Sequence, residues 1–473
     1  MKKIYISLLL ILGISAMTTS CSLDTENYQD IPTEEAYTSV QDVQNGMVGA
    51  YWALGTYRFY GKNVVAFGDM SADIAVGSQS SGHFANISRY VVSESATGEL
   101  EEVWEYGYKV IDRCVRTIQG ANKVLSSSPN LSNADKANIK LYVSQCYSLR
   151  ALANFTLVNM FALPYHAGVN NLGIPLLVDK PLDAFEKTER ATVGQTYDRI
   201  LLDITEAKKL MEEALSADIK EPSAFYFNRA AIYALEARVN LYMGNLAAAK
   251  IAAQKAIELK GYKEPSNEGY ISMWSSIAIS DEDIFTISKT TDDNLSANAL
   301  NTLYGSYKGA LVTGFASKFF NSTDIRLGLI NGSHPAKFDG ISTAQAVNNI
   351  PVFRKSEMYL IIAEVEAKAE NIELAQEALF YTAKRDVAIT SPDKLPSTKA
   401  DLLGFISKER VREFFEEGHR YYDARRTGEL ITVVNGTKPN FDVSKFVFPI
   451  PADEINSGSG VVQNPNWSAA LPK

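Results

Sequence analysis

The segment 229–259 constrains the fold more than any other part of the chain. Apolar and small residues recur through it with a helical period, and Gly244-Asn245 interrupts the pattern near its middle. Glycine followed by asparagine is typical of the end of one helix and the turn into the next. Small side chains at matched positions let two antiparallel helices approach closely, and these are Ala237, Ala249, Ala253 and Ala256. The segment therefore predicts a helical hairpin of the tetratricopeptide kind.

Three further segments show the same kind of pattern more weakly. In 357–383, Ala363 and Ala375 fall at the same spacing as the first two alanines of the first hairpin. The segments 104–125 and 141–161 each read as an amphipathic helix. Because a single hairpin cannot bury its own apolar face, about four such units must stack or pack on other parts of the chain.

Two long insertions separate these units. Residues 56–100 and 260–350 are rich in glycine, serine and aromatic residues. We expect mostly loop there, with a few short β-hairpins, and loops this long in a compact domain are usually functional. The predicted fold class is mostly α, a tetratricopeptide-like scaffold with long loop-rich insertions.

The first twenty residues predict an export signal rather than part of the fold. Lys2 and Lys3 precede an apolar stretch over 4–17, which is too short for a stable membrane span. Cys21 follows directly, as does the lipid-acceptor cysteine of bacterial lipoproteins. Simple secretion with a free Cys21 is the alternative. We therefore expect a signal peptide over 1–20, a single domain over 21–473, and acyl chains as the membrane attachment.

Charge and rare residues exclude several other functions. The chain carries 46 Lys+Arg against 55 Asp+Glu, a formal net charge of −9, which argues against a nucleic-acid partner. Its four histidines are scattered without metal-ligand spacing, so we expect no metal site, and no phosphate loop or other cofactor motif occurs. Cys114 and Cys146 lie in apolar helical patterns. Buried thiols and a disulfide between two helices are both compatible with export.

An ordered series of motifs runs along almost the whole mature chain. The most specific blocks are 409–428, which contains Glu-Arg-Val-Arg-Glu and Glu-Gly-His-Arg-Tyr-Tyr-Asp, and 448–467, which ends in Gln-Asn-Pro-Asn-Trp. The others are Ile31–Ser39, Asn45–Tyr51, Arg150–Phe155, Gly173–Leu176 and Ser356–Leu360. Together with Cys21 this series resembles the SusD/RagB family of Bacteroidetes outer-membrane lipoproteins. The stretch 380–386 departs from the family, which usually has an asparagine and a basic pair there.

The resemblance implies a fold, a place and a role. Family members are mostly α, with four tetratricopeptide-like units, and are lipid-anchored on the outer face of the outer membrane. They cap a partner TonB-dependent, SusC-like transporter and bind glycan before its import, without catalysis. The resemblance thus predicts an oligosaccharide-binding surface lipoprotein. The same scaffold binding peptide or glycopeptide cargo is the alternative, and a glycosidase with paired carboxylates is a third hypothesis.

The motif block 409–428 is better explained by structure than by catalysis. Acidic residues alternate there with arginines, and arginine neighbours lower the pKa of a carboxyl group, which is the opposite of what a general acid needs. We expect an ion-pair network that fixes the last repeat. The closing segment 463–467 predicts a terminal clamp packed on the body of the protein.

The two insertions supply the residue types that bind sugars. Aromatic faces stack on the C–H faces of a sugar ring, while Asp, Asn and Arg bond paired hydroxyls. Core packing is the competing interpretation for each of these side chains. Trp274 and Tyr307 are the best candidate stacking platforms. The other predicted ligand-binding residues are Tyr304, Asp69, Asp73, Phe84 and Arg89, within a larger set that also includes Tyr57 and Asn294.

Overall fold

The computed structural model describes residues 36–95, 98–182 and 186–472. The predicted signal peptide and Cys21 lie outside these residues. No helix in the described ranges is long and apolar enough to cross a membrane.

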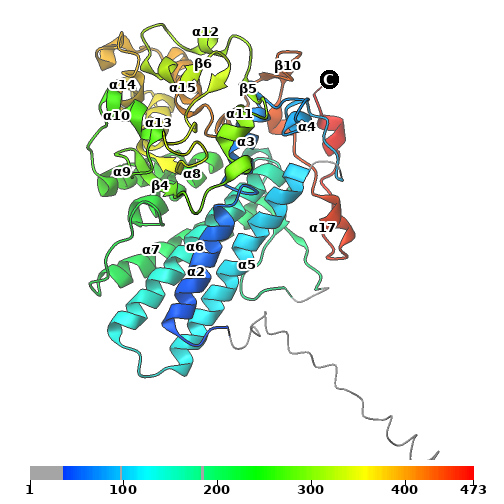
Figure 1. The fold of residues 1–473 in the computed structure, drawn as a ribbon, viewed down its shortest axis with the longest axis vertical. Helices are drawn as coiled ribbons and strands as arrows, with labels where there is room; N and C mark the ends of the chain where they lie inside the picture. Colours follow the sequence, from blue (N-terminus) through cyan, green and yellow to red (C-terminus); the bar gives the residue numbers. More distant parts are fainter. Residues whose placement is uncertain (1–35, 96–97, 183–185, 473) are drawn as a thin grey trace, which may run out of the picture.

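Long antiparallel helices form the N-terminal half of the molecule. Four of them lie side by side as a bundle (Figure 1): α2 (Val40–Leu54), α5 (Gly98–Ser127), α6 (Asn133–Phe161) and α7 (Val193–Leu215). Local signals start them, because Ser39 and Ser132 each form a capping box with an aspartate three residues later. The segments 104–125 and 141–161 lie within α5 and α6, which pack on each other.

The predicted hairpin over 229–259 is confirmed. It consists of α8 (Arg229–Met243) and α9 (Leu246–Lys260), and Gly244 makes the turn at φ 79°, the left-handed region that glycine adopts without strain. The four small residues that predicted it are fully buried: Ala237, Ala249, Ala253 and Ala256. Burial of these methyl groups lets the two helices pack closely.

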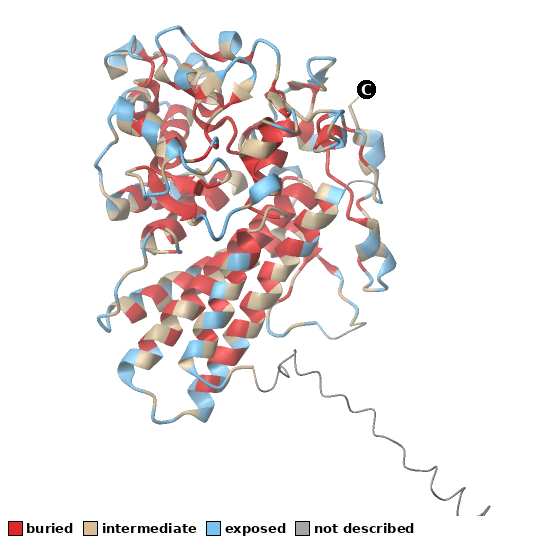
Figure 2. Ribbon diagram, in the orientation of Figure 1, coloured by how far each residue is buried: buried red, intermediate tan, exposed pale blue. Residues whose placement is uncertain are grey.

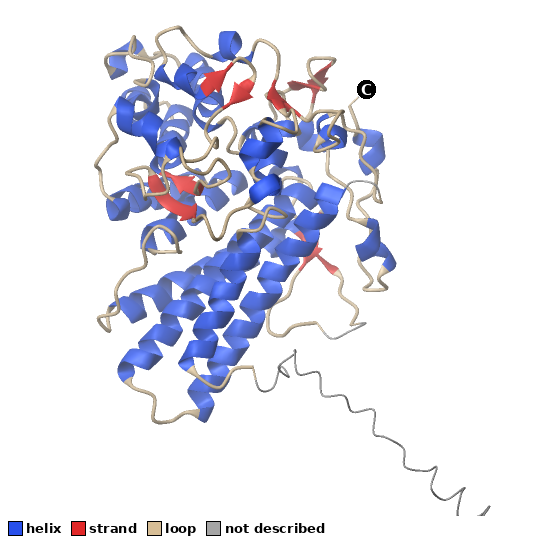
Figure 3. Cartoon of the chain, viewed as in Figure 1, coloured by secondary structure: helices blue, strands red, loops and turns tan. Residues whose placement is uncertain are grey.

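A second hairpin stacks on the first, as the weaker repeat predicted. It pairs α13 (Lys355–Lys368) with α14 (Ile372–Ala383), and Ala363 and Ala375 are fully buried. Helices α15 (Lys399–Phe414) and α16 (Arg420–Thr427) complete this half of the molecule. The mostly α, tetratricopeptide-like fold class is confirmed (Figure 3).

Short strands join segments that are distant in sequence. The described residues form five two-stranded antiparallel pairs, drawn red in Figure 3. They are β1 (Ala75–Val76) with β5 (Ala310–Leu311), β2 (Leu172–Pro175) with β3 (Arg190–Thr192), β4 (Asp283–Ile287) with β8 (Ile350–Arg354), β6 (Ile330–Asn331) with β7 (His334–Pro335), and β9 (Ile431–Val433) with β10 (Lys438–Phe441). The β1–β5 pair, with Ala75 opposite Leu311, ties the two predicted insertions together.

The insertions contain more structure than the sequence indicated. The largest correction concerns α3 (Asn63–Met70), in which every residue is buried. The other short helices of these insertions are α4 (Ala85–Ser88), α10 (Asn267–Ser272), α11 (Leu300–Tyr304) and α12 (Phe315–Phe319). Helix α17 (Ala452–Asn456) lies near the C-terminus. Figure 2 shows buried residues through both halves of the molecule, and one apolar core extends from α2 to the C-terminal segment.

The two cysteines of the bundle are free thiols. Cys114 on α5 and Cys146 on α6 are both fully buried and are not joined by a disulfide. Burial raises the pKa of the Cys114 thiol well above its ordinary value. The prediction of buried thiols is confirmed.

Candidate functional site

Most of the predicted sugar-contacting residues lie in the interior. The exposed fraction of Trp274 is 4%, because the Lys337 ammonium lies 4.6 Å from its ring centroid and Phe338 packs edge-on against it. Tyr304 and Phe84 are buried in the same apolar core. Burial therefore contradicts the predicted stacking platform at Trp274 and the predicted ligand contacts of Tyr304 and Phe84. Loops rich in aromatic residues fold inward here, and their rings form part of the apolar core.

The two predicted acidic residues are buried as well. Asp73 forms an ion pair with Arg420, at 2.7 Å from Oδ1 to Nε, so its carboxylate is occupied by the protein itself. Asp69 on α3 has no exposed surface, and burial raises its pKa to about 7. Neither carboxylate is available to bond sugar hydroxyls, which corrects both predictions.

Tyr307 and Arg89 are at the surface, and their role in ligand binding stays a prediction. The half-buried Tyr307 ring stacks on His83, with centroids 4.0 Å apart and an interplanar angle of 17°. Arg89 is exposed, and its guanidinium faces the amide of Gln79. The β1–β5 pair brings these segments of the two insertions together. One ring face of Tyr307 is therefore already covered by protein.

A surface groove with a cavity volume of about 300 Å³ opens beside this region. Three segments build it: the end of α2 with the turn after it, the first half of α5, and the chain that follows β4. We call it the aromatic groove, and its lining residues are Trp52, Gly55, Thr56, Tyr57, Arg58, Tyr106, Lys289, Asp293, Asn294, Leu295 and Asn298. Pockets of about 300–1,000 Å³ are typical of small-molecule sites.

The aromatic side of the groove is held by cations. Trp52 is 53% exposed, and the Arg113 guanidinium carbon lies 5.0 Å from its ring centroid. Arg58 lies 5.1 Å and 5.0 Å from the ring centroids of Tyr57 and Tyr106, and its Nε donates to the Tyr57 hydroxyl at 3.0 Å. The hydrogen bond from Arg58 to Tyr106 raises the pKa of the guanidinium, so it stays charged. The rings are thus fixed before any ligand arrives.

The turn that carries Tyr57 and Arg58 is tightly folded. The amides of Phe59 and Gly61 both donate to the Thr56 carbonyl, at 3.1 Å and 2.9 Å. A Cβ on Gly61 would lie 2.6 Å from that same oxygen, so this close turn requires glycine. The groove therefore rests on a rigid turn rather than on a free loop.

The lining that follows β4 is polar. Lys289 forms an ion pair with Asp293 at 3.1 Å, and the Asn294 amide closes a turn by donating to the Thr291 carbonyl at 2.6 Å. The half-buried Asn298 side chain makes no hydrogen bond to the described residues, so its donor and acceptor are open to a ligand. The lining of the groove thus combines aromatic faces with an amide and an ion pair.

Lys62 connects the aromatic groove to the Tyr307 stack. Its Nζ lies 5.0 Å from the Tyr57 ring centroid. Burial lowers the pKa of His83, and the charge of Lys62 lowers it further, so the imidazole that stacks on Tyr307 favours the neutral form. The two features belong to one continuous region of the molecule.

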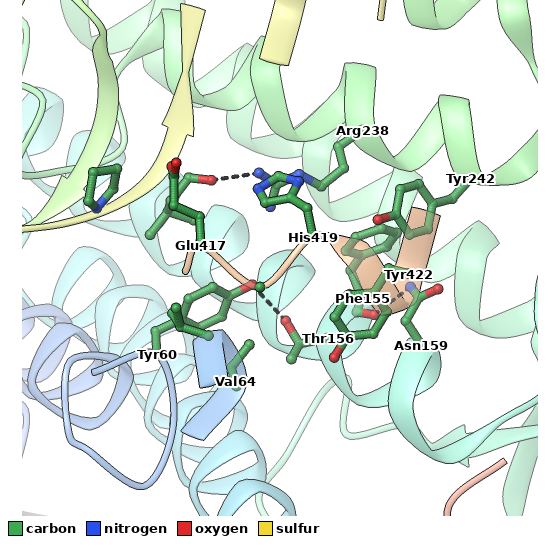
Figure 4. Close-up of a pocket in the computed structure, with 14 residues that line it drawn as sticks. Tyr60, Val64, Phe155, Thr156, Asn159, Arg238, Tyr242, Glu417, His419 and Tyr422 are labelled. Atoms are coloured by element: carbon green, nitrogen blue, oxygen red, sulfur yellow. Dashed lines mark hydrogen bonds between the residues drawn. The ribbon is translucent and has the colours of Figure 1, made fainter. Parts of the chain in front are cut away.

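A second cavity lies inside the molecule and is far smaller (Figure 4). It measures about 50 Å³ and lies among the side chains of α3, α6, α8 and α16. Arg238 crosses it to form an ion pair with Glu357 at 2.6 Å, and burial lowers the pKa of His419 well below its ordinary value. A space of this volume holds water rather than a sugar ring, so this cavity is not the ligand site.

Buried ion pairs fill the interior of the half of the molecule that contains α13 to α16. Glu413 on α15 accepts from three arginines, at 3.1 Å from Arg326, 2.9 Å from Arg354 and 2.6 Å from Arg385. These arginines hold the pKa of Glu413 far below its usual range, although burial alone would raise it. We call this network the charged centre, and its members are Glu282, Asp324, Glu409, Glu413, Glu417, Arg326, Lys337, Arg354, Arg385 and Arg412.

The charged centre confirms the predicted ion-pair network of the block 409–428, but the network extends beyond that block. The block 409–428 does form ion pairs, and Glu409 binds Arg412 within it at 2.7 Å. The partners of Glu413 and Glu417, however, lie well outside the block.

Among the described residues there is no group of three or more His, Cys, Asp or Glu side chains that could hold a metal ion.

Trp52 was not among the residues that the sequence indicated, although a signal for it existed. On α2 the buried side chains include Val43, Met47 and Leu54, which leaves Val48 and Trp52 on the opposite face, 44% and 53% exposed. A large aromatic residue on the polar side of an amphipathic helix suggests a contact with something outside the fold.

The chain combines stacked helical hairpins with a groove large enough for a small ligand. Two family sequence models match the chain: one described as starch-binding and associating with the outer membrane, over residues 22–241, and the SusD family over residues 313–467. Between them they cover most of the chain, which therefore belongs to the SusD/RagB family.

Similar proteins support this assignment. The chain is 22% identical to a SusD-like protein of Formosa agariphila over 92% of this chain and 93% of the other. It is 25% identical to SusD superfamily crystal structures from Bacteroides vulgatus (TM-score 0.79, 91% of this chain and 100% of that one) and Bacteroides thetaiotaomicron (TM-score 0.78, 90% and 100%). A SusD-like carbohydrate-binding protein from Bacteroides vulgatus has the same fold, with a TM-score of 0.73 at 16% identity over 92% of this chain and 99% of that one.

Proposed function

We propose that this protein binds oligosaccharide in the aromatic groove and presents it for import. The observation that carries the proposal is the pairing of an exposed indole, Trp52, with the open amide of Asn298 in a groove of about 300 Å³. Sugar rings have an apolar C–H face and a rim of hydroxyls, which match an aromatic face and an amide. Arg58 and the Lys289–Asp293 pair add charged partners for hydroxyl groups.

Binding to this groove should be weak on its own. A few stacking and hydrogen-bonding contacts only slightly exceed the free-energy cost of ordering a flexible sugar, so we expect a Kd of about micromolar to millimolar. Holding the protein at a membrane beside its transporter raises the effective concentration of the bound sugar. Weak binding is therefore sufficient for delivery.

The proposed location is the outer membrane, with the chain lipid-anchored through Cys21 and exposed at the cell surface. A partner TonB-dependent, SusC-like transporter would receive the sugar. Support comes from the family description, which names association with the outer membrane, and from the signal pattern that precedes Cys21. No nucleic acid, cofactor or metal is part of the proposal.

The proposed role is binding without catalysis. Glu413 and Glu409 are buried in ion pairs with arginines, and these arginines counter burial and lower the pKa of both carboxyl groups. Carboxyl groups in this state do not protonate a leaving group. Both carboxylates are held by arginines of the fold instead.

Affinity measurements on the mature chain without its lipid test the proposal. Calorimetry with neutral and acidic oligosaccharides and with peptides would identify the cargo, and Trp52→Ala should weaken glycan binding about 2–12-fold, the value of one lost aromatic contact. Tyr262→Ala is the matched control, because Tyr262 is 67% exposed and does not line the groove. Glycan binding that is equal in both variants would contradict the site. Binding of peptides alone would contradict the cargo.

A further inference from the structure

A second and larger groove lies where the C-terminal segment crosses the body of the protein. Its cavity volume is about 600 Å³, within the range of ligand sites. The loop after α6, the start of β2 and the last residues of the chain form its walls. We call it the terminal groove, and its lining residues are Leu163, Asn170, Asn171, Leu172, Lys445, Val447, Asn464, Pro465, Asn466, Trp467, Ala469 and Ala470.

The floor of the terminal groove is firmly fixed. The buried Asn464 amide donates to the carbonyls of Phe161 and Phe448, at 2.9 Å and 2.8 Å, and its Oδ1 accepts from Arg190 at 2.8 Å. These bonds join the C-terminal segment to Phe161 at the end of α6 and to Arg190, the first residue of β3. The segment 463–467 therefore clamps the body, as the sequence predicted. A groove on this clamp keeps its shape without a ligand.

One aromatic residue in this groove is held in place by its polar edge. The indole N–H of the half-buried Trp467 donates to Glu94 Oε1 at 3.2 Å, which fixes the orientation of the ring beside the cavity. The chain has four tryptophans, at positions 52, 104, 274 and 467. Trp104 and Trp274 are 4% exposed, whereas Trp52 and Trp467 each line a groove. Every tryptophan outside the core therefore borders a ligand-sized cavity.

The polar side of the terminal groove consists of amides rather than charges. The side chains of Asn170, Asn171 and Asn466 make no hydrogen bond to the described residues. Each amide offers both donors and acceptors, which suits hydroxyl groups that also donate and accept. The lining residues include no carboxylate, and the one cation, Lys445, is paired with Asp442 at 3.0 Å.

We propose that the terminal groove is a second binding site, specific for a neutral oligosaccharide. The fixed indole provides the stacking surface, and the three amides bond the hydroxyl rim of the sugar. An anionic sugar or a charged peptide would find no free counter-charge among the lining residues. Two sites on one chain let a single polysaccharide be held at two points, which raises avidity without any stronger contact.

Tryptophan fluorescence can report binding in each groove separately, because each groove is lined by one tryptophan. The Trp52→Phe variant of the mature chain leaves Trp467 as the only tryptophan outside the core, and it can be titrated with maltoheptaose, laminarihexaose, xylohexaose and mannohexaose. We expect a saturable change in emission with at least one of these neutral sugars. The loss of one amide contact, in Asn171→Ala or Asn466→Gly, should weaken that response about 2–12-fold.

The structure supplies matched variants for this test. Asn466 has φ 57°, a conformation that glycine adopts without strain, so Asn466→Gly removes the amide and keeps the backbone. Ser468→Ala is the control, since Ser468 is exposed, adjacent and not part of the lining, and its affinity should be unchanged.

The possible failures are distinguishable. If the wild type responds but Trp52→Phe is silent with every sugar, only the aromatic groove binds and the second site is wrong. If neither protein responds to any sugar, both this inference and the proposed function are overturned. A preference of Trp52→Phe for oligogalacturonate, abolished by salt, would overturn the neutral class of ligand.

Discussion

The N-terminal bundle and the charged centre are equally hidden from solvent but are built from opposite chemistry. In the bundle, buried side chains such as Leu149, Leu152 and Leu157 pack by shape. In the charged centre, ion pairs connect five carboxylates to five cations, so the buried charges balance. The bundle joins helices that are neighbours in sequence, whereas the charged centre joins segments that are far apart.

This difference shows what each kind of contact can specify. Apolar packing tolerates small shifts, since many arrangements bury similar area. A bidentate arginine–carboxylate pair fixes both distance and orientation, and removing one partner leaves an uncompensated charge. We infer that the charged centre sets how the insertions and the last repeat dock, and that the aromatic groove depends on that docking through β4 and the chain after it.

The largest expected effect comes from removing the carboxylate at the middle of the charged centre. Glu413→Ala leaves Arg326, Arg354 and Arg385 with a deficit of negative charge in a fully buried place. We expect the free energy of unfolding to fall by about 3–5 kcal/mol, measured by urea denaturation. Glu258→Ala breaks an exposed pair with Lys255 and should cost less than about 1 kcal/mol. Equal midpoints for the two variants would contradict the role of the charged centre.

Asp69 is a buried carboxyl group that has no ion pair among the described residues, so it shows what burial does when no arginine compensates the charge. Burial raises its pKa from 3.8 to about 7 in the folded state. Between pH 4 and 7 the unfolded chain therefore loses this proton more readily, and the free energy of unfolding declines as pH rises. Asp69→Asn should remove that decline and stabilise the protein at pH 7 by up to about 4 kcal/mol.

Thermal unfolding of Asp69→Asn at several pH values measures this effect. Asp292→Asn, in an exposed loop, is the control and should keep the pH dependence of the wild type. A mutant whose stability falls with rising pH as steeply as the wild type would show that Asp69 is ionised in the fold.

Two glycines at close contacts sharpen the comparison further. A Cβ on Gly68 of α3 would lie 1.8 Å from the Gly418 carbonyl oxygen, which is backbone and cannot move aside. A Cβ on Gly107 of α5 would meet only the Leu157 side chain, at 2.8 Å, which can change its rotamer. Gly68→Ala should therefore cost about 2–3 kcal/mol and Gly107→Ala distinctly less, as measured by differential scanning calorimetry. The reverse order would contradict the rigid docking of α3.

The sequence predicted those features that depend on local pattern. Small residues at a helical spacing were enough for α8 and α9, and the same spacing found α13 and α14. The partners of Glu413 could not be predicted, since Arg326, Arg354 and Arg385 are brought to it only by the tertiary fold. The burial of Trp274 could not be predicted either, because an aromatic residue in a Ser-rich segment gives the same sequence pattern whether its loop folds inward or outward. Trp52 could have been predicted from the apolar pattern of its own helix, because Val43, Met47 and Leu54 define one face and Trp52 lies on the other.

The most direct test of the central claim is a crystal structure of the protein soaked with the oligosaccharide that binds it most tightly. The account predicts a sugar ring stacked on the Trp52 indole, with hydroxyl groups bonded to Asn298 and Arg58. A sugar bound elsewhere on the described surface, with no density beside Trp52, would contradict it.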